Sequence, residues 1–315
     1  MLEDSGAKSL SGWATAISPG PASESSQTVT FSASVDAPGL FAVQPAVASG
    51  GTLTYTPAAN ANGVATVTVT AHDDGGTANG GTDTSPARTF SITIEAVDDA
   101  PSFSAGDDET VLEDAGAQAV SGWATAVSPG PANESSQTVT FTVSADNTGL
   151  FAIQPAVSSG GQLTYKPAAN ANGVATVTVT AHDDGGTANG GVDSSPPQTF
   201  IVTVRPVNDA PSFTAGADQT VVSLLGAQTV PGWATNISPG PGNESSQSVT
   251  FVLTNDNPGL FAAQPAVAAN GTLTYTPTAL ALGSATVTVQ ATDNGGTADG
   301  GNDQSPPQTF TITII

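Results

Sequence analysis

The chain has 315 residues, of which 38% are apolar and 5% aromatic, so it is long enough for two or three domains with small cores. Its 27 acidic and 4 basic residues give a formal charge of −23, which argues against nucleic acids and anionic membranes as partners and favours cations. The absence of cysteine excludes disulfides and cysteine-ligated zinc. No apolar run approaches the ~20 residues of a membrane span, and the acidic start "MLEDSGAKSL" is unlike a signal peptide.

Three copies of one unit fill the chain. Trp13, Trp123 and Trp233 are spaced by 110 residues, and the segment "SGWATAISPGPASESSQTVTF" around the first recurs with few changes at the other two. No insertion or deletion breaks the register, so the repeat is a whole domain rather than one turn of a solenoid. The first copy begins part-way along its first strand, and we expect it to be a truncated repeat in a piece of a longer protein. The predicted domains are residues 1–97, 98–207 and 208–315.

Apolar and polar residues alternate along each unit at a period of two. In "ATVTVTA", Val67 and Val69 face one way and the threonines face the other, which predicts a strand with one buried face. No segment has the period of a helix. In chain order the predicted strands are "ETVLED" (109–114), "AQAVSGWA" (117–124), "SQTVTF" (136–141) and "GLFAIQPAV" (149–157), followed, with the numbers of the first copy, by "GTLTYTP" (51–57), "ATVTVTA" (65–71) and "TFSITIE" (89–95).

About seven short strands in about 100 residues, separated by Gly, Pro and Asn clusters, are typical of an immunoglobulin-like β-sandwich. We therefore predict an all-β protein with three tandem seven-stranded sandwiches in an extended rod. The repeated tryptophan is expected in the core between the two sheets. Its alternative role is to stack against a sugar at the surface.

An acidic pair precedes a proline at both predicted boundaries, in "VDDAPSF" and in the related "VNDAPSF". Pro101 and Pro211 cannot donate a backbone hydrogen bond, so each suits the entrance of an edge strand. Adjacent carboxylates repel each other, and a cation between them would relieve that repulsion. The linkers are therefore candidate cation sites.

Longer motifs around these linkers resemble those of cadherins. The segment "DAPSFSAGDDETVLEDAG" resembles the start of a cadherin domain, in which an acidic linker precedes Pro-x-Phe and a Glu follows. The segments "VTVTAHDDGG" and "TFSITIEAVDDAPSF" resemble its end, where Ala-x-Asp-x-Gly closes one strand and the last strand runs into the next linker. With "YTPAANANGVATVTVTAHDDGG", the unit is also similar to the cadherin-like tandem repeats of very large bacterial surface and secreted proteins, many of them adhesins.

This resemblance implies calcium between successive domains, because cadherins bind calcium there. Calcium takes six to eight oxygen ligands and prefers carboxylates and carbonyls, which these positions offer. The ligands implied at the first junction are Glu3, Asp98, Asp99 and Asp183, and at the second junction Glu113, Asn208, Asp209 and Asp293.

The chain also departs from the cadherin pattern. The linker is one residue shorter, and the mid-domain Asp-x-Asp has no match in "TAVSPGPANESS", so we expect fewer ions at each junction. Arg205 stands where the first junction has Glu95, which predicts a weaker second site. The third copy has Ser223 and Leu224 in place of the Glu and Asp, which predicts that any junction after it is absent or free of calcium.

Other interpretations of these residues stay open at this stage. The acids could be solvated turn residues, since Asp and Asn favour turns. Asp74 and Asp83 could form a small cation site within the loop "DDGGTANGGTDTSP". His72 lies beside Asp73, but the third copy has Thr292 at the histidine position and no nucleophile recurs nearby, so we expect no enzyme.

The sequence thus predicts a calcium-stiffened structural and adhesive extender module of a large bacterial surface or secreted protein. Its expected location is extracellular, and its expected state is a monomer. The expected partners are the neighbouring repeats of the same polypeptide and a cell-surface or matrix ligand. The alternative is a β-sandwich that itself binds a carbohydrate or a protein through its loops.

Overall fold

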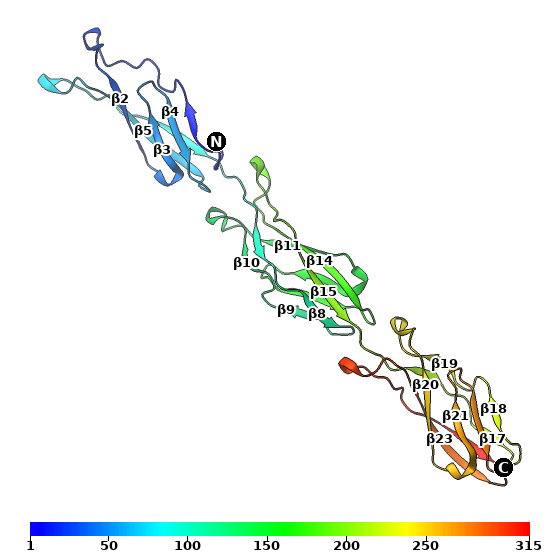
Figure 1. Cartoon of the computed structure of the whole chain (residues 1–315). Helices are drawn as coiled ribbons and strands as arrows, with labels where there is room; N and C mark the ends of the chain where they lie inside the picture. Colours follow the sequence, from blue (N-terminus) through cyan, green and yellow to red (C-terminus); the bar gives the residue numbers. More distant parts are fainter.

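The computed structural model describes residues 1–315 as three β-domains that follow one another along a rod (Figure 1). The C-terminus lies at the far end of domain 3. The N-terminus lies beside the first junction, where Leu2 forms a parallel bridge with Glu95. Helical structure is limited to short 3-10 turns, and none of it is long and apolar enough to cross a membrane. The prediction of an all-β rod is confirmed.

Domain 2 contains two main sheets that face each other. One has the strand order β11-β14-β15-β8, in which only β15 and β8 are parallel, and the other has the order β12-β13-β9. A short pair, β7 with β10, closes one end. The strands are β7 (Ser102–Ser104), β8 (Glu109–Leu112), β9 (Gln118–Val120), β10 (Thr125–Ser128), β11 (Thr140–Ala145), β12 (Phe151–Val157), β13 (Leu163–Pro167), β14 (Gly173–His182) and β15 (Gln198–Arg205).

These nine segments are the seven predicted strands. The first predicted strand is divided into β7 and β8, and the second into β9 and β10, because loops at residues 105–108 and 121–124 interrupt each of them. Domain 3 repeats the arrangement in the same register. Its strands are β16 (Ser212–Thr214), β17 (Gln219–Val221), β18 (Gln228–Val230), β19 (Thr235–Ser238), β20 (Thr250–Asn255), β21 (Phe261–Val267), β22 (Leu273–Pro277), β23 (Gly283–Thr292) and β24 (Gln308–Ile314).

Domain 1 has only the later strands of this fold. Its sheets have the orders β2-β5-β6 and β1-β4-β3, so each has three strands. The equivalents of β7, β8 and β10 are missing as strands. The strands present are β1 (Lys8–Leu10), β2 (Val29–Val35), β3 (Phe41–Val47), β4 (Leu53–Pro57), β5 (Gly63–Asp73) and β6 (Arg88–Ile94).

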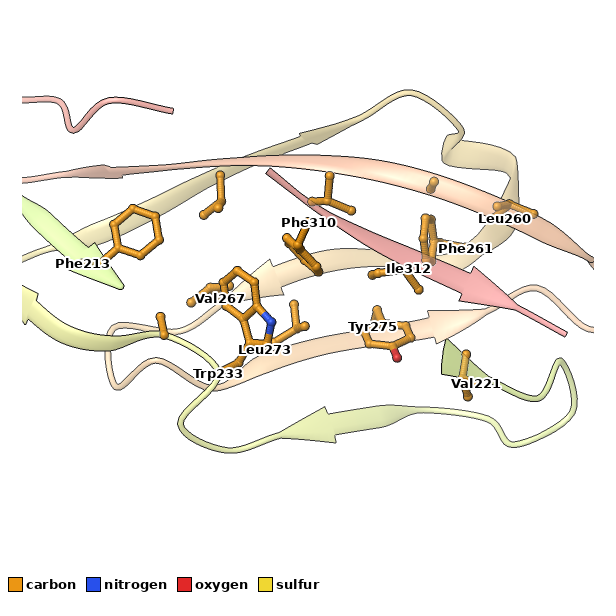
Figure 2. Close-up of a cluster of buried hydrophobic side chains, with 14 of the residues drawn as sticks. Phe213, Val221, Trp233, Leu260, Phe261, Val267, Leu273, Tyr275, Phe310 and Ile312 are labelled. Atoms are coloured by element: carbon orange, nitrogen blue, oxygen red, sulfur yellow. The ribbon is translucent and has the colours of Figure 1, made fainter. Parts of the chain in front are cut away.

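The period-two apolar residues form the core of each domain. In domain 3 the ring of Trp233 faces Phe310 between the sheets, with 4.3 Å between the ring centroids (Figure 2). Trp123 and Phe200 repeat this contact in domain 2 at 4.5 Å. Both tryptophans are only 3% exposed, so the prediction of a core role is confirmed for them.

Trp13 is less well covered than its two counterparts. It contacts Phe90 at 4.7 Å but remains partly exposed, beside an open groove of about 370 Å³ that Leu10 and Tyr55 also line. In domain 2 the equivalent indole donates a hydrogen bond to the carbonyl of Asp107, in the segment for which domain 1 has no counterpart. The core of domain 1 accordingly has 9 buried residues, against 16 and 17 in domains 2 and 3.

Candidate metal centre at the domain junctions

At each junction the linker is held by one glutamate from each of the two domains. At the first junction Glu3 of domain 1 accepts a hydrogen bond from the Val97 amide at 2.8 Å, and Glu134 of domain 2 accepts one from the Asp99 amide at 2.9 Å. Successive side chains of an extended chain alternate in direction, and so do its amides, so two residues apart suffices to give each domain one amide. The two carboxylates thereby fix the path of the chain between the domains.

The second junction repeats this clamp. Glu113 of domain 2 accepts a hydrogen bond from the Val207 amide, and Glu244 of domain 3 accepts one from the Asp209 amide, both at 2.8 Å. The amide of Asn243, which belongs to domain 3, also donates to both carboxylate oxygens of Glu113, at 3.1 and 3.2 Å. Glu113 therefore contacts the linker and the next domain at once.

Between the two glutamates, Asp98 reaches into domain 2. Its Oδ1 accepts a hydrogen bond from Nε2 of Gln137 at 2.8 Å, and its carbonyl accepts one from the Val192 amide at 2.9 Å. A Cβ atom placed on Gly185 would lie 1.6 Å from that same Oδ1, so only glycine leaves room for the Asp98 carboxylate. The glycine after the acidic pair in "AHDDGG" is thus explained by the approach of the linker.

The carboxylates at both junctions are largely removed from water. Glu3 and Glu113 are 2% exposed, and Glu134, Glu244 and Asp293 are 5–7% exposed. Buried carboxylates are costly unless their charge and their lone pairs are satisfied. Yet one oxygen of several of these groups is buried without any hydrogen-bond partner: Oδ2 of Asp98, Oε2 of Glu134 and Oδ2 of Asp183 at the first junction, and Oδ2 of Asp209, Oε2 of Glu244 and Oδ2 of Asp293 at the second.

The acids of the first junction also act on one another electrostatically. Burial raises the pKa of Glu134, and the nearby charges of Asp98, Asp99 and Asp183 raise it further, against the hydrogen bond from the Asp99 amide. Burial likewise raises the pKa of Asp183, and the Asp98 carboxylate adds to the rise. A neutral or cationic neighbour would have the opposite effect, so these shifts identify a site with an excess of negative charge.

The second junction behaves in the same way. Burial raises the pKa of Glu244, with further contributions from Asp209, Asp293 and Glu113. Burial also raises the pKa of Asp209, and the nearby carboxylate of Asp114 adds to it. No basic side chain compensates these groups, because the single ion pair of the chain joins two other residues.

The donor set at both junctions fits a hard cation such as calcium. All the groups without partners are carboxylate oxygens, which is the chemistry that calcium prefers. A cavity of about 150 Å³ at the first junction is lined by Asp98 and Glu134, and one of about 310 Å³ at the second is lined by Asn208 and Glu244. No three acidic or histidine side chains already converge as a finished metal site, because the second oxygen of each clamping glutamate is turned to a backbone amide. A cation would require the carboxylates to turn slightly inward.

The structure gathers the eight residues named from the sequence into two groups, one at each junction. Asn208 differs from its counterpart Asp98. Its Nδ2 donates to Oδ1 of Asp293 at 3.0 Å and to the carbonyl of Asn302 at 2.9 Å, while its Oδ1 accepts from Gln247. The amide thus satisfies part of the Asp293 charge, which a carboxylate at this position could not do.

Sequence reasoning missed Glu134 and Glu244. Both lie in the segment in which no acidic match was expected, immediately after the Asn of "NES". The available signal was internal: a Glu followed three residues later by a Gln occurs in all three copies, and in domains 2 and 3 both members contact the linker. A search for Asp-x-Asp could not find them, because a single longer side chain does the work from a turn.

Two other expectations about charged residues need correction. Arg205 does not point at the second junction's carboxylates but pairs with Asp299 at the surface. Glu95 is exposed, and only its backbone takes part in the first junction. In the glycine-rich loop, Asp74 accepts hydrogen bonds from the amide and hydroxyl of Thr28 at 2.9 and 2.8 Å, which accounts for it as a structural turn residue.

No protein-family model matches the chain, and no curated protein sequence is significantly similar to it. Among solved structures, the EC1-4 fragment of Drosophila N-cadherin has 16% identity and a TM-score of 0.41, and covers 92% of this chain and 67% of its own. The EC1-2 fragment of human protocadherin-24 has 17% identity and a TM-score of 0.42, over 68% of this chain and 97% of its own. Extracellular cadherin domains 1–5 of protocadherin gamma B2 have 18% identity and a TM-score of 0.45, over 92% and 53%. A likeness this remote says nothing about metals or partners.

Proposed function

We propose that this chain is a structural and adhesive extender: three β-sandwiches in a row, stiffened by calcium at the two junctions, in a large bacterial protein that works outside the cell. Its immediate partners are the neighbouring repeats of the same polypeptide, and the ligand it helps to present is a cell-surface or matrix molecule. A row of sandwiches with small interfaces moves freely at its joints by default, so a device that fixes the joints would be needed for such a role.

The single observation that carries the proposal is the set of buried carboxylate oxygens without partners, three at each junction. Elsewhere in the chain, acids such as Asp184 find amide and hydroxyl donors in their own domain. The junction acids come instead from three separate segments: the end of one domain, the linker and the next domain. A charge of opposite sign among them would hold all three segments together.

The chain's own residues supply the positioning. The two clamping glutamates of each junction fix the linker, and the linker in turn carries Asp98 or Asn208 into the next domain. Bound calcium would supply a divalent positive charge shared among six to eight oxygens. The acidic pair in the linker is then tolerable, because the repulsion between its carboxylates is offset by attraction to the ion.

A reciprocal exchange between the two linkers tests the proposal. We expect two calcium sites by calorimetric titration, with dissociation constants of about 10⁻⁴ to 10⁻³ M, and the first tighter than the second because of its greater negative charge. Asp98→Asn should weaken the first site roughly tenfold, and Asn208→Asp should strengthen the second by a similar factor. Each change should leave the other junction unaltered.

Magnesium at equal concentration is the control, since it dehydrates reluctantly and demands a more regular site. The proposal would be wrong if calcium at about 10 mM produced neither heat nor a change in the scattering-derived maximum dimension, because that concentration exceeds the expected dissociation constants. A change of equal size at both sites for either single variant would instead refute the assignment of the linker residues.

A further inference from the structure

Domain 3 ends in an exposed apolar surface. Six apolar residues there, which we call the leucine pole, are 48–76% exposed. Large apolar side chains gathered on one surface mark interaction sites in soluble proteins. Ile315 places this pole at the far end of the rod, beside the C-terminus (Figure 1). The leucine pole consists of Val222, Leu224, Leu225, Leu280, Leu282 and Ile315.

The same positions in domains 1 and 2 are polar and belong to the junctions. Asp114 and Asn170 stand where domain 3 has Leu224 and Leu280, and the Asn170 amide donates to Asp114 at 3.0 Å. Asn172, at the position of Leu282, lines the cavity of the second junction. The leucine pole is therefore the surface with which a domain of this type meets its neighbour, rebuilt from apolar side chains.

Backbone strain at Leu280 points to a role in binding. Its φ is +64°, a left-handed conformation that is unfavourable for leucine and that Asn60 and Asn170 adopt more easily in the other domains. The side chain is also 76% exposed, so it gains nothing from the core. Strain that folding does not compensate is characteristic of functional surfaces.

Charge determines which surface the leucine pole can meet. The free end of domain 1 gathers Glu24, Asp73 and Asp83 around its cavities, so a head-to-tail contact would bury acids against leucine. Ser223 and Leu224 have replaced the Glu and Asp of the other copies, which leaves the leucine pole without an acid of its own. In a chain with a charge of −23, the best complement on offer is the same pole of another molecule.

We propose that the leucine pole is a calcium-independent contact through which two copies of this chain associate end to end. A two-fold contact of this kind is self-complementary, as apolar surfaces are. Six residues make a patch smaller than the ~800 Å² per partner of a standard interface, so the association should be weak and depend on concentration. The monomer expected from the sequence would then be the dilute state of a longer, two-molecule rod.

Sedimentation equilibrium and small-angle scattering over about 10 µM to 1 mM protein test this, since weak contacts populate in that range. We expect the mass to rise from 30.8 kDa toward twice that value, and the maximum dimension to rise about twofold with it, with or without a chelator. The triple variant Leu224→Asp, Leu280→Asn, Leu282→Asn places the residues of domain 2 at the pole and should remain monomeric. These residues already fold at these positions, so a folding defect is not expected.

Val252→Thr is the matched control, because it removes an exposed apolar side chain away from the pole and restores the residue of domain 2 at that position. It should leave the dimer intact. A chain that stays monomeric at the highest concentration overturns the proposal. So does a dimer that survives the triple variant, or one whose maximum dimension is that of a single rod, since either would require another contact surface.

Discussion

Arg205, at the end of domain 2, forms an ion pair across the second junction with Asp299 in a loop of domain 3, with 2.5 Å between Nη2 and Oδ2. The first junction has Glu95 and Asn189 at the corresponding positions, so both partners differ together between the two junctions. The pair directs the guanidinium away from the carboxylates of the proposed site. A substitution that seems unfavourable for calcium in the sequence is thereby moderated by a second one.

Asp299→Asn should weaken calcium binding at the second junction, because Arg205 is then free to turn toward the buried acids. The pair is about half exposed, so its own contribution to stability is below about 1 kcal/mol and the affinity should fall by a factor of about 2 to 5. Calorimetric titration would show this as a change in one site only. Arg205→Glu in the same chain removes the free cation, and this double variant should bind at least as tightly as the original; continued weakness would contradict the explanation.

Glu244→Gln should lower the calcium affinity of the second junction by about tenfold or more, since a carboxylate ligand is lost. In the absence of calcium the same change should stabilise the fold, because a buried charge near three other acids disappears while one oxygen remains for the Asp209 amide. Glu24→Gln is the matched control: the residue holds the same position in domain 1, where no linker amide reaches it. If both variants behaved alike, Glu244 would not belong to the site.

The fold could be predicted from the sequence because its information is local and repeated. Alternation along "ATVTVTA" predicts which face of β5 is buried, and Ala65, Val67 and Val69 are buried as expected. The exact 110-residue register gave the domains without any structure. The divisions within the first two strands were not predictable, because they depend on the pairing of β7 with β10, residues that are far from each other in any strand pattern.

The candidate site could be predicted only where adjacent residues suggested it. Asp98 and Asp99 stand out because two neighbouring acids need an explanation. Glu134 does not, since its relation to Asp99 spans 35 residues and arises only when the turn after β10 folds over the linker. The destination of Arg205 was equally hidden, because Asp299 lies in a loop with no pattern of its own.

Without calcium, the stability of domains 2 and 3 should increase as the pH falls from about 7 toward about 5. Four junction acids have raised pKa values, so the folded state binds more protons than the unfolded chain in this range, and protonation favours folding. With calcium the trend should reverse, because protons compete for the same oxygens. Thermal unfolding followed by circular dichroism, with and without calcium, would check both signs. The four acids are Glu134, Asp183, Asp209 and Glu244.

Below about pH 4 the trend without calcium should turn downward. Hydrogen bonds from a backbone amide and a hydroxyl lower the pKa of Asp74, Asp184 and Asp36, with Thr28, Thr138 and Thr66 as the respective donors. The stability that these carboxylates contribute is present above their unfolded pKa and is lost as the pH falls through the folded value. A stability that decreased steadily from neutral pH would show that the junction acids have ordinary pKa values.

Domain 1 should unfold before the other two domains. It has no counterpart of Phe103, whose burial alone contributes about 1.5–3 kcal/mol in domain 2, and its Trp13 is only partly covered. In urea we expect a first transition with a shift in tryptophan fluorescence, followed by a second transition of domains 2 and 3. Trp13→Phe should remove the fluorescence change of the first transition and spare that of the second. A single transition by fluorescence and by circular dichroism alike would show that the three domains unfold together.

Removing calcium should change the shape of the molecule and leave its strands intact. The cores are built from alternating Val, Ile and Phe and contain none of the junction acids, so a chelator has no route to them. At a calcium concentration of about 100 times the dissociation constant, a site stabilises the joined state by about 2.7 kcal/mol, which is enough to shift a joint from mobile to rigid. With about 3.3 Å per strand residue and 11 residues in β5, three domains in line should reach on the order of 120 Å. Scattering should give that maximum dimension in calcium and a shorter, broader distribution in chelator, while the circular dichroism of the strands stays constant; loss of the strand signal on chelation would mean that the ion holds the domains themselves rather than the angles between them.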